Sequence, residues 1–287
     1  MTEPAEIEAI SAELQSLRGT GRQIEPFSRR YPEFGLQGAY RVVARTRDLR
    51  IELGERPVGR KIGFTNKAIW RAKGISAPIW NYVFDQTVAE IGGDGADVDL
   101  RGMPEPRIEP EVVLHLCAAP QPGMTTRELL ECLDWVAPGF EVVYSVFPGW
   151  EFAAADAAAA FGVHGALFVG KHLEVVPATS SVLGDHVALS VVLESDDGLR
   201  REGSGRDVLG GPIDALSFLV EELAHSSVCD ALKPGEIVTT GTLTEAMPLL
   251  PGRTWSATTA HPFRELVRQR QYRGRRGPAA GTRARVV

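Results

Sequence analysis

The feature that most limits the fold is the segment at residues 107–116, where two acidic residues precede an apolar run. If this segment is a strand, Glu109 and Glu111 project to the same side, roughly 6.5 to 7 Å apart along the backbone. Two carboxylates at the mouth of a buried strand repel each other unless a cation lies between them. The segment therefore predicts a divalent-cation site with oxygen ligands, and two solvated carboxylates at a strand end are the alternative.

A third acidic residue, Glu141, begins another apolar run at residues 140–144. A helix-like segment at 125–137 and a Pro138-Gly139 turn come before it. We expect the Glu141 side chain to reach the space shared by the first two carboxylates. Three carboxylates with positions left for water and substrate suit Mg²⁺ or Mn²⁺, and such a metal is expected to be catalytic.

Lys61 lies in a short run with glycines on both sides, residues 59–65. The glycines permit close backbone approach, and the apolar neighbours Ile62 and Phe64 can remove water from the ammonium group. Such burial lowers the pKa of a lysine towards neutrality, unless nearby carboxylates hold it charged. A surface lysine beside Arg60 is the alternative.

Composition indicates an ordinary soluble globular protein, since 44 % of the 287 residues are hydrophobic and 24 % are charged. There is no long uncharged apolar run, and the first residues are acidic where a signal peptide is basic, so we expect a cytoplasmic protein that does not enter a membrane. Cys117, Cys132 and Cys229 are too widely spaced for a disulfide framework, and buried reduced thiols are expected.

The net charge of −6 hides a basic C-terminal segment, because residues 264–287 hold eight arginines and one acidic residue. A nucleic-acid footprint has this charge. The segment is short, rich in Gly and Ala, and has only Tyr272 as an aromatic residue. We therefore interpret it as a solvated extension and expect no nucleic-acid partner.

Periodic apolar residues predict three helices and a sheet-rich core. The helices are expected at residues 7–17, 36–53 and 212–224. A strand that ends at Gly241 is expected after the third helix. The glycines at 203–211 lack the spacing of a phosphate-binding loop and suit a hairpin turn. We expect a helical lead (1–56) packed on one catalytic domain (57–262), followed by the tail (263–287).

Several segments together resemble one family. They are GRKIGFT at 59–65, APIW at 77–80 with Asp85, PRIEPE at 106–111 and WVAPGFE at 135–141, with looser matches at 155–156, 209–212 and 240–242. The chain, from about residue 30 to about residue 255, resembles the 2-keto-4-pentenoate hydratase and 2-oxo-3-hexenedioate (4-oxalocrotonate) decarboxylase branch of the fumarylacetoacetate hydrolase superfamily. The joint occurrence of the lysine block with the three glutamates is what makes this resemblance specific.

The resemblance implies an α+β fold with a mixed β-roll, and a homo-oligomer that acts on a small 2-oxo acid. It implies that Mg²⁺ or Mn²⁺ binds Glu109, Glu111 and Glu141. Lys61 and Asp85 would move protons, and Phe64 and Thr242 would contact substrate. The activity expected first is hydration of a 2-hydroxy-2,4-dienoate to a 4-hydroxy-2-oxo acid, and decarboxylation of a 2-oxo-3-enedioate at the same metal site is the alternative.

Two other functions are less consistent with the sequence. Carbon–carbon bond hydrolysis in this superfamily uses a histidine upstream of the metal ligands, but the first histidine here is His115. An oligomeric binding protein that uses the fold as a scaffold is the non-enzymatic alternative. One departure concerns substrate identity, since Tyr144 stands where many hydratases of the family carry an aspartate.

Overall fold

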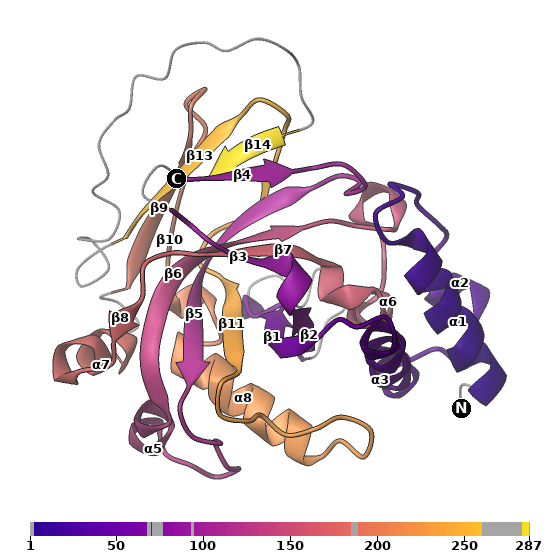
Figure 1. The fold of residues 1–287 in the computed structure, drawn as a ribbon, viewed down its shortest axis with the longest axis horizontal. Helices are drawn as coiled ribbons and strands as arrows, with labels where there is room; N and C mark the ends of the chain where they lie inside the picture. Colours follow the sequence, from indigo (N-terminus) through magenta and orange to yellow (C-terminus); the bar gives the residue numbers. More distant parts are fainter. Residues whose placement is uncertain are drawn as a thin grey trace.

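A nine-stranded mixed sheet forms the body of the molecule in the computed structural model (Figure 1), which describes residues 3–67, 70, 77–92, 95–184, 189–259 and 283–286. The strand order is β2-β1-β11-β5-β6-β7-β3, with β12 paired to β5 and β8 paired to β6. The strands are β1 (Pro57–Gly63), β2 (Ile79–Phe84), β3 (Val88–Glu90), β5 (Arg107–Leu116), β6 (Leu133–Val143), β7 (His164–Val169), β8 (Leu173–Glu174), β11 (Ile237–Thr242) and β12 (Met247–Pro248).

A second sheet has the order β10-β9-β13-β14-β4. Its strands are β4 (Ala96–Asp99), β9 (Ser190–Ser195), β10 (Arg200–Ser204), β13 (Thr254–Thr259) and β14 (Arg283–Val286). β14 pairs with both β13 and β4, so residues 283–286 lie inside this sheet and the expectation of a solvated extension is wrong there. The arginine-rich residues 260–282 lie outside the described residues.

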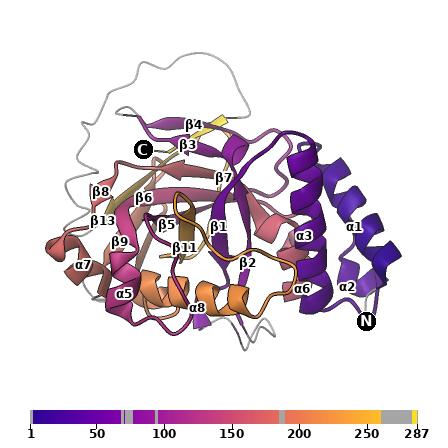
Figure 2. The same cartoon turned by 60° about the horizontal axis from the view of Figure 1, so that its bottom comes forward.

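The helices are α1 (Pro4–Leu17), α2 (Phe27–Arg30), α3 (Leu36–Glu52), α5 (Thr126–Glu131), α6 (Ala154–Ala159), α7 (Pro177–Gly184) and α8 (Pro212–Ala224), with 3-10 turns η2 (Asp85–Thr87), η3 (Pro148–Trp150), η4 (Phe161–Val163) and η5 (Gly205–Asp207). The three helices predicted from apolar periodicity are confirmed as α1, α3 and α8. In Figure 2, α1 and α3 lie together at one end of the molecule, and α7 lies at the other. Within the described ranges, every helix is too short or too polar to span a bilayer.

Strand β6 differs from the prediction, because the expected helix at 125–137 is helical only in α5 and the Pro138-Gly139 pair lies inside the strand. The partner of β6 on one side changes here, from β8 at Trp135 and Val136 to β7 at Gly139. Proline is tolerated where a ladder is interrupted. A side chain at Gly139 would meet Val113 Cγ2 at 2.8 Å, so close strand packing requires a glycine there.

Side-chain alternation along β5 separates its two faces. The apolar residues Ile108, Val112 and Leu114 join the large core that also contains the buried face of α8. Val113 belongs to a smaller cluster with residues of β2, β6, β7 and β11. Glu109 and Glu111 have the parity of Val113, so the sheet presents them on the face opposite to the α8 core.

The lead helices pack on the sheet through a second apolar cluster, in which Ile10 and Leu14 of α1 meet Val42 of α3 and Ala157 of α6. The three cysteines are free as expected, but Cys117 is exposed rather than buried.

Candidate active site

The three predicted carboxylates meet in the structure. Glu109 lies directly opposite Glu141 in the β5–β6 ladder, and Glu111 lies two residues further along β5. One oxygen of each carboxylate lies within 4.8 Å of the others, in an arrangement that could hold a metal ion. Glu111 and Glu141 are buried, and Glu109 is partly exposed. The alternative of separate solvated carboxylates is therefore excluded.

The turn at the end of β11 holds Glu111. The amide of Gly241 donates a hydrogen bond to Glu111 Oε2 at 3.0 Å. Gly241 has a φ of 98°, and a Cβ there would lie 2.2 Å from Thr65 Oγ1. Only glycine tolerates both the left-handed backbone and this contact. The remaining oxygen, Glu111 Oε1, is buried without a hydrogen-bond partner.

Burial and mutual repulsion shape the charges of the cluster. Burial, with a further contribution from Glu141, raises the pKa of Glu109 to about 7, although Lys61 opposes the rise. Burial and the neighbouring carboxylates also raise the pKa of Glu111. Burial alone would raise the pKa of Glu141, but Lys61 and His164 hold it at about 2. Buried carboxylate oxygens that lack donors and repel one another fit a hard divalent cation.

Lys61 lies inside the cluster. Its side chain is buried, with Nζ 3.1 Å from Glu141 Oε2, and it donates a hydrogen bond to the carbonyl of Gly162 at 3.0 Å. Burial would lower the pKa of Lys61, but Glu141, Glu109 and Glu111 raise it above its ordinary value. The carboxylates therefore hold this lysine charged, and the surface alternative is wrong.

His164 also contacts the site, although it is not among the residues that the sequence analysis selected. It is buried, and its partners connect it to the site, since Nδ1 lies 2.7 Å from Glu141 Oε1 and Nε2 lies 2.9 Å from Thr87 Oγ1. The connection follows from the β6–β7 ladder, where His164 pairs with Val143. No motif or spacing in the sequence links His164 to Glu141.

The other predicted residues lie at strand ends, Phe64 after β1, Asp85 after β2 and Thr242 at the end of β11. Phe64 follows β1 with a φ of 58° and stacks on Phe152. Thr242 pairs with Glu111 in the sheet, while its hydroxyl donates to the carbonyl of Thr244. Asp85 begins η2, and its carboxylate pairs with Arg56 rather than with a described member of the cluster.

Comparison with known proteins gives relatives over most of the chain, although no family model matches. A 4-oxalocrotonate decarboxylase from Pseudomonas sp is 31 % identical over 203 residues, which cover 71 % of this chain and 75 % of that protein. A 2-hydroxyhexa-2,4-dienoate hydratase from Comamonas testosteroni is 29 % identical over 255 residues, covering 88 % and 93 %. A 2-keto-4-pentenoate hydratase from Paraburkholderia xenovorans is 27 % identical over 252 residues, covering 87 % and 89 %.

Solved structures show the same fold. The 4-oxalocrotonate decarboxylase from Pseudomonas putida G7, complexed with magnesium and adipate, has a TM-score of 0.82 to this chain at 22 % identity, and the match covers 100 % of this chain and 99 % of that one. The predicted α+β fold is thereby confirmed.

Proposed function

Because the chain belongs to the 2-keto-4-pentenoate hydratase and 4-oxalocrotonate decarboxylase branch of the fumarylacetoacetate hydrolase superfamily, we propose that it is a divalent-metal-dependent lyase that hydrates a 2-hydroxy-2,4-dienoate. The observation that carries this proposal is the cluster of three carboxylates beside a buried lysine. Curated relatives that match 87 % or more of the chain are named as hydratases, which supports hydration as the first activity.

Glu109, Glu111 and Glu141 would hold Mg²⁺ or Mn²⁺. When bound, such a cation supplies a Lewis acid that stabilises negative charge on a 2-oxo acid as its enolate forms. The chain itself holds two of these carboxylates in place through hydrogen bonds from other strands. The Gly241 amide positions Glu111, and His164 positions Glu141.

Lys61 is proposed as the group that delivers and removes protons when the dienol and the ketone interconvert. Its ammonium group already contacts Glu141 and the Gly162 carbonyl, so its position is fixed before substrate arrives. Asp85 is proposed as a second proton-transfer group, which requires its carboxylate to leave Arg56. Phe64 and Thr242 are proposed to contact substrate at the ends of β1 and β11.

Decarboxylation of a 2-oxo-3-enedioate is the second candidate. It is supported by the 31 % identical relative, which is named as a 4-oxalocrotonate decarboxylase. The same metal site would accept the electron pair that CO₂ leaves behind, and water would not be consumed. The two activities thus differ in their products and not in their ligand set.

The deciding experiment follows the change in dienol absorbance on a panel of 2-hydroxy-2,4-dienoates and 2-oxo-3-enedioates with Mg²⁺, and measures CO₂ in parallel. Hydration predicts absorbance loss without CO₂, and decarboxylation predicts one CO₂ per substrate consumed. Glu109→Gln should abolish either activity, while Glu202→Gln on the exposed strand β10 should leave it unchanged. Activity that survives both Glu109→Gln and removal of metal would contradict the proposal.

A further inference from the structure

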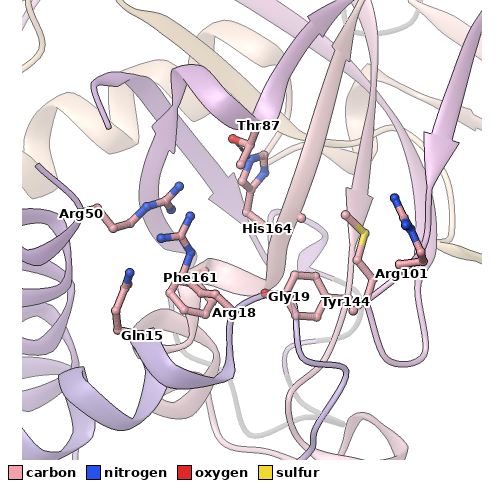
Figure 3. A pocket seen from close by; sticks show the side chains of 12 residues that line it. Gln15, Arg18, Gly19, Arg50, Thr87, Arg101, Tyr144, Phe161 and His164 are labelled. Atoms are coloured by element: carbon pink, nitrogen blue, oxygen red, sulfur yellow. Dashed lines mark hydrogen bonds between the residues drawn. The ribbon is translucent and has the colours of Figure 1, made fainter. Parts of the chain in front are cut away.

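A cavity of about 430 Å³ lies between the lead helices and the β6–β7 part of the large sheet. Figure 3 shows Arg18 and Arg50 on one side of it, Arg101 on the other, and His164 with Thr87 at its wall. The three arginines come from the end of α1, from α3 and from the loop after β4. None of the described residues that line this cavity is an aspartate or a glutamate. The cavity therefore has a cationic lining.

The charged groups next to this cavity carry a net positive charge. Arg18 and Arg50 share one carboxylate, Glu55, which Arg18 contacts at 2.6 and 3.0 Å and Arg50 at 2.8 and 2.5 Å. The side chains of Arg50 and Glu55 are 5 % and 6 % exposed, so little water screens this group. Burial, followed by repulsion from Arg18, lowers the pKa of Arg50 to about 10. Two guanidinium groups held by one carboxylate leave one positive charge without a partner among these residues, and such a charge is costly in a buried place.

Tyr144 and Arg101 complete the wall. Tyr144 lies at the position where the sequence departs from the family pattern of an aspartate, and its phenol is buried beside the cavity. Burial raises the pKa of this phenol, and the charges of Arg18 and Arg50 oppose the rise. Arg101 pairs with Asp99 but is 71 % exposed, so its guanidinium can turn towards an incoming anion without unfolding any part of the chain.

We propose that this cavity is a second binding site, separate from the metal cluster, for a small molecule with a carboxylate or phosphate group. Guanidinium groups bind both oxyanions through paired N–H donors, and Arg18, Arg50 and Arg101 approach the cavity from two sides. The volume is that of a small-molecule site. Because none of the candidate metal ligands lines this cavity, the proposal stands independently of the proposed function.

The test is calorimetric titration of the Mg²⁺-loaded protein with inorganic phosphate and, in a separate arm, with succinate, at constant ionic strength. Saturable binding of one or both is expected, and the arm with the higher affinity identifies the preferred oxyanion. Arg18→Gln and Arg101→Gln should each weaken that binding at least tenfold. Arg200→Gln, which changes an exposed arginine on β10, should leave it unchanged.

Binding in Glu109→Gln separates this site from the metal cluster, since Glu109 does not line the cavity. Retained affinity in Glu109→Gln supports the proposal, whereas affinity that is lost in this variant and retained in Arg18→Gln overturns it. Absence of saturable binding of both anions to the unmodified protein also overturns it, as does unchanged affinity in both cavity variants. If Arg18→Gln does not fold, the exposed Arg101→Gln decides the question alone.

Discussion

At the scale of single residues, Lys61 is the group whose charge the site controls most directly. Its ammonium group is surrounded by three carboxylates and a carbonyl, and its stem packs against Gly162, where a Cβ would lie 2.9 Å from Lys61 Cδ. A methionine keeps the length and apolar packing of this side chain and removes its charge. Comparison of the two side chains therefore separates proton transfer from packing.

We expect Lys61→Met to lower kcat by about 10²- to 10⁴-fold, the range by which a positioned acid–base group accelerates a reaction. The measurement is dienol turnover with saturating Mg²⁺, together with the far-ultraviolet circular dichroism spectrum. Lys67→Met, which alters a lysine outside the cluster, serves as the control. A folded Lys61→Met protein with unchanged kcat would show that Lys61 has no role in proton transfer.

His164 is the residue that the sequence did not connect with the site. Partners that orient a metal ligand typically change metal affinity by 10- to 100-fold when they are removed. We therefore expect His164→Ala to weaken Mg²⁺ binding by about that factor, measured by calorimetric titration, while the exposed His225→Ala leaves affinity unchanged. Equal Mg²⁺ affinity in the two variants would mean that Glu141 needs no support from His164.

At the scale of elements, the turn that ends β11 is expected to be intolerant of any side chain. Gly241→Ala forces both a left-handed alanine and a clash with Thr65 Oγ1, and the strained backbone alone costs about 1 to 3 kcal/mol. Gly198→Ala is the matched control, because Gly198 has a φ of 89° and open space around it. Chemical denaturation should show a larger loss of stability for Gly241→Ala, and equal losses would argue against close packing on Thr65.

Glu55 connects the end of α1 with α3, because Arg18 and Arg50 both pair with its carboxylate. Burial would raise the pKa of Glu55, but Arg18 and Arg50 lower it overall. An acid with a lowered pKa in the folded state adds stability above its ordinary pKa of 4.5 and loses it as the pH falls through the folded value. We expect the unmodified protein to lose stability below about pH 4.5. Glu55→Gln should lower the free energy of unfolding by about 3 kcal/mol at neutral pH. This variant should then lose less stability than the unmodified protein as the pH falls.

Urea denaturation between pH 3 and pH 7 measures this difference. Glu13→Gln is the control, because Glu13 pairs with Arg30 at a partly exposed position where an ion pair contributes about 1 kcal/mol or less. The same pH dependence in Glu55→Gln and in the unmodified protein would contradict a role for this carboxylate.

At the scale of the whole molecule, the three carboxylates lie on the adjacent strands β5 and β6 at the centre of the large sheet, so metal binding should stabilise the entire fold. A ligand at one hundred times its Kd adds about 2.7 kcal/mol to the free energy of unfolding. Addition of Mg²⁺ to chelator-treated protein should therefore raise its Tm. The same addition should change the Tm of Glu109→Gln very little. An equal rise in both proteins would indicate that Mg²⁺ binds elsewhere.

The sequence predicted the cluster because alternation along a strand is a local property, so Glu109 and Glu111 shared a face as soon as residues 107–116 were interpreted as β5. Glu141 was expected in the same space because it begins an apolar run at residues 140–144, whereas Lys61 became a candidate site residue through the family resemblance. The contact of His164 with Glu141 could not be predicted, since it depends on the register between β6 and β7. The Pro138-Gly139 pair predicts a turn, and this prediction is wrong because pairing with β5 and β7 outweighs local turn preference.

One series of contacts runs from Thr87 through His164 and Glu141 to Lys61 and Gly162, and it takes one residue or more from β1, β6, β7, η2 and η4. Each of these five residues contacts the next one in the series, so a replacement at one position disturbs the contacts of its neighbours. Natural variation should therefore accumulate at other positions around the substrate. Members of this branch that act on different substrates would then share this series unchanged. They would differ in the apolar residues that enclose the end of the substrate away from the metal site.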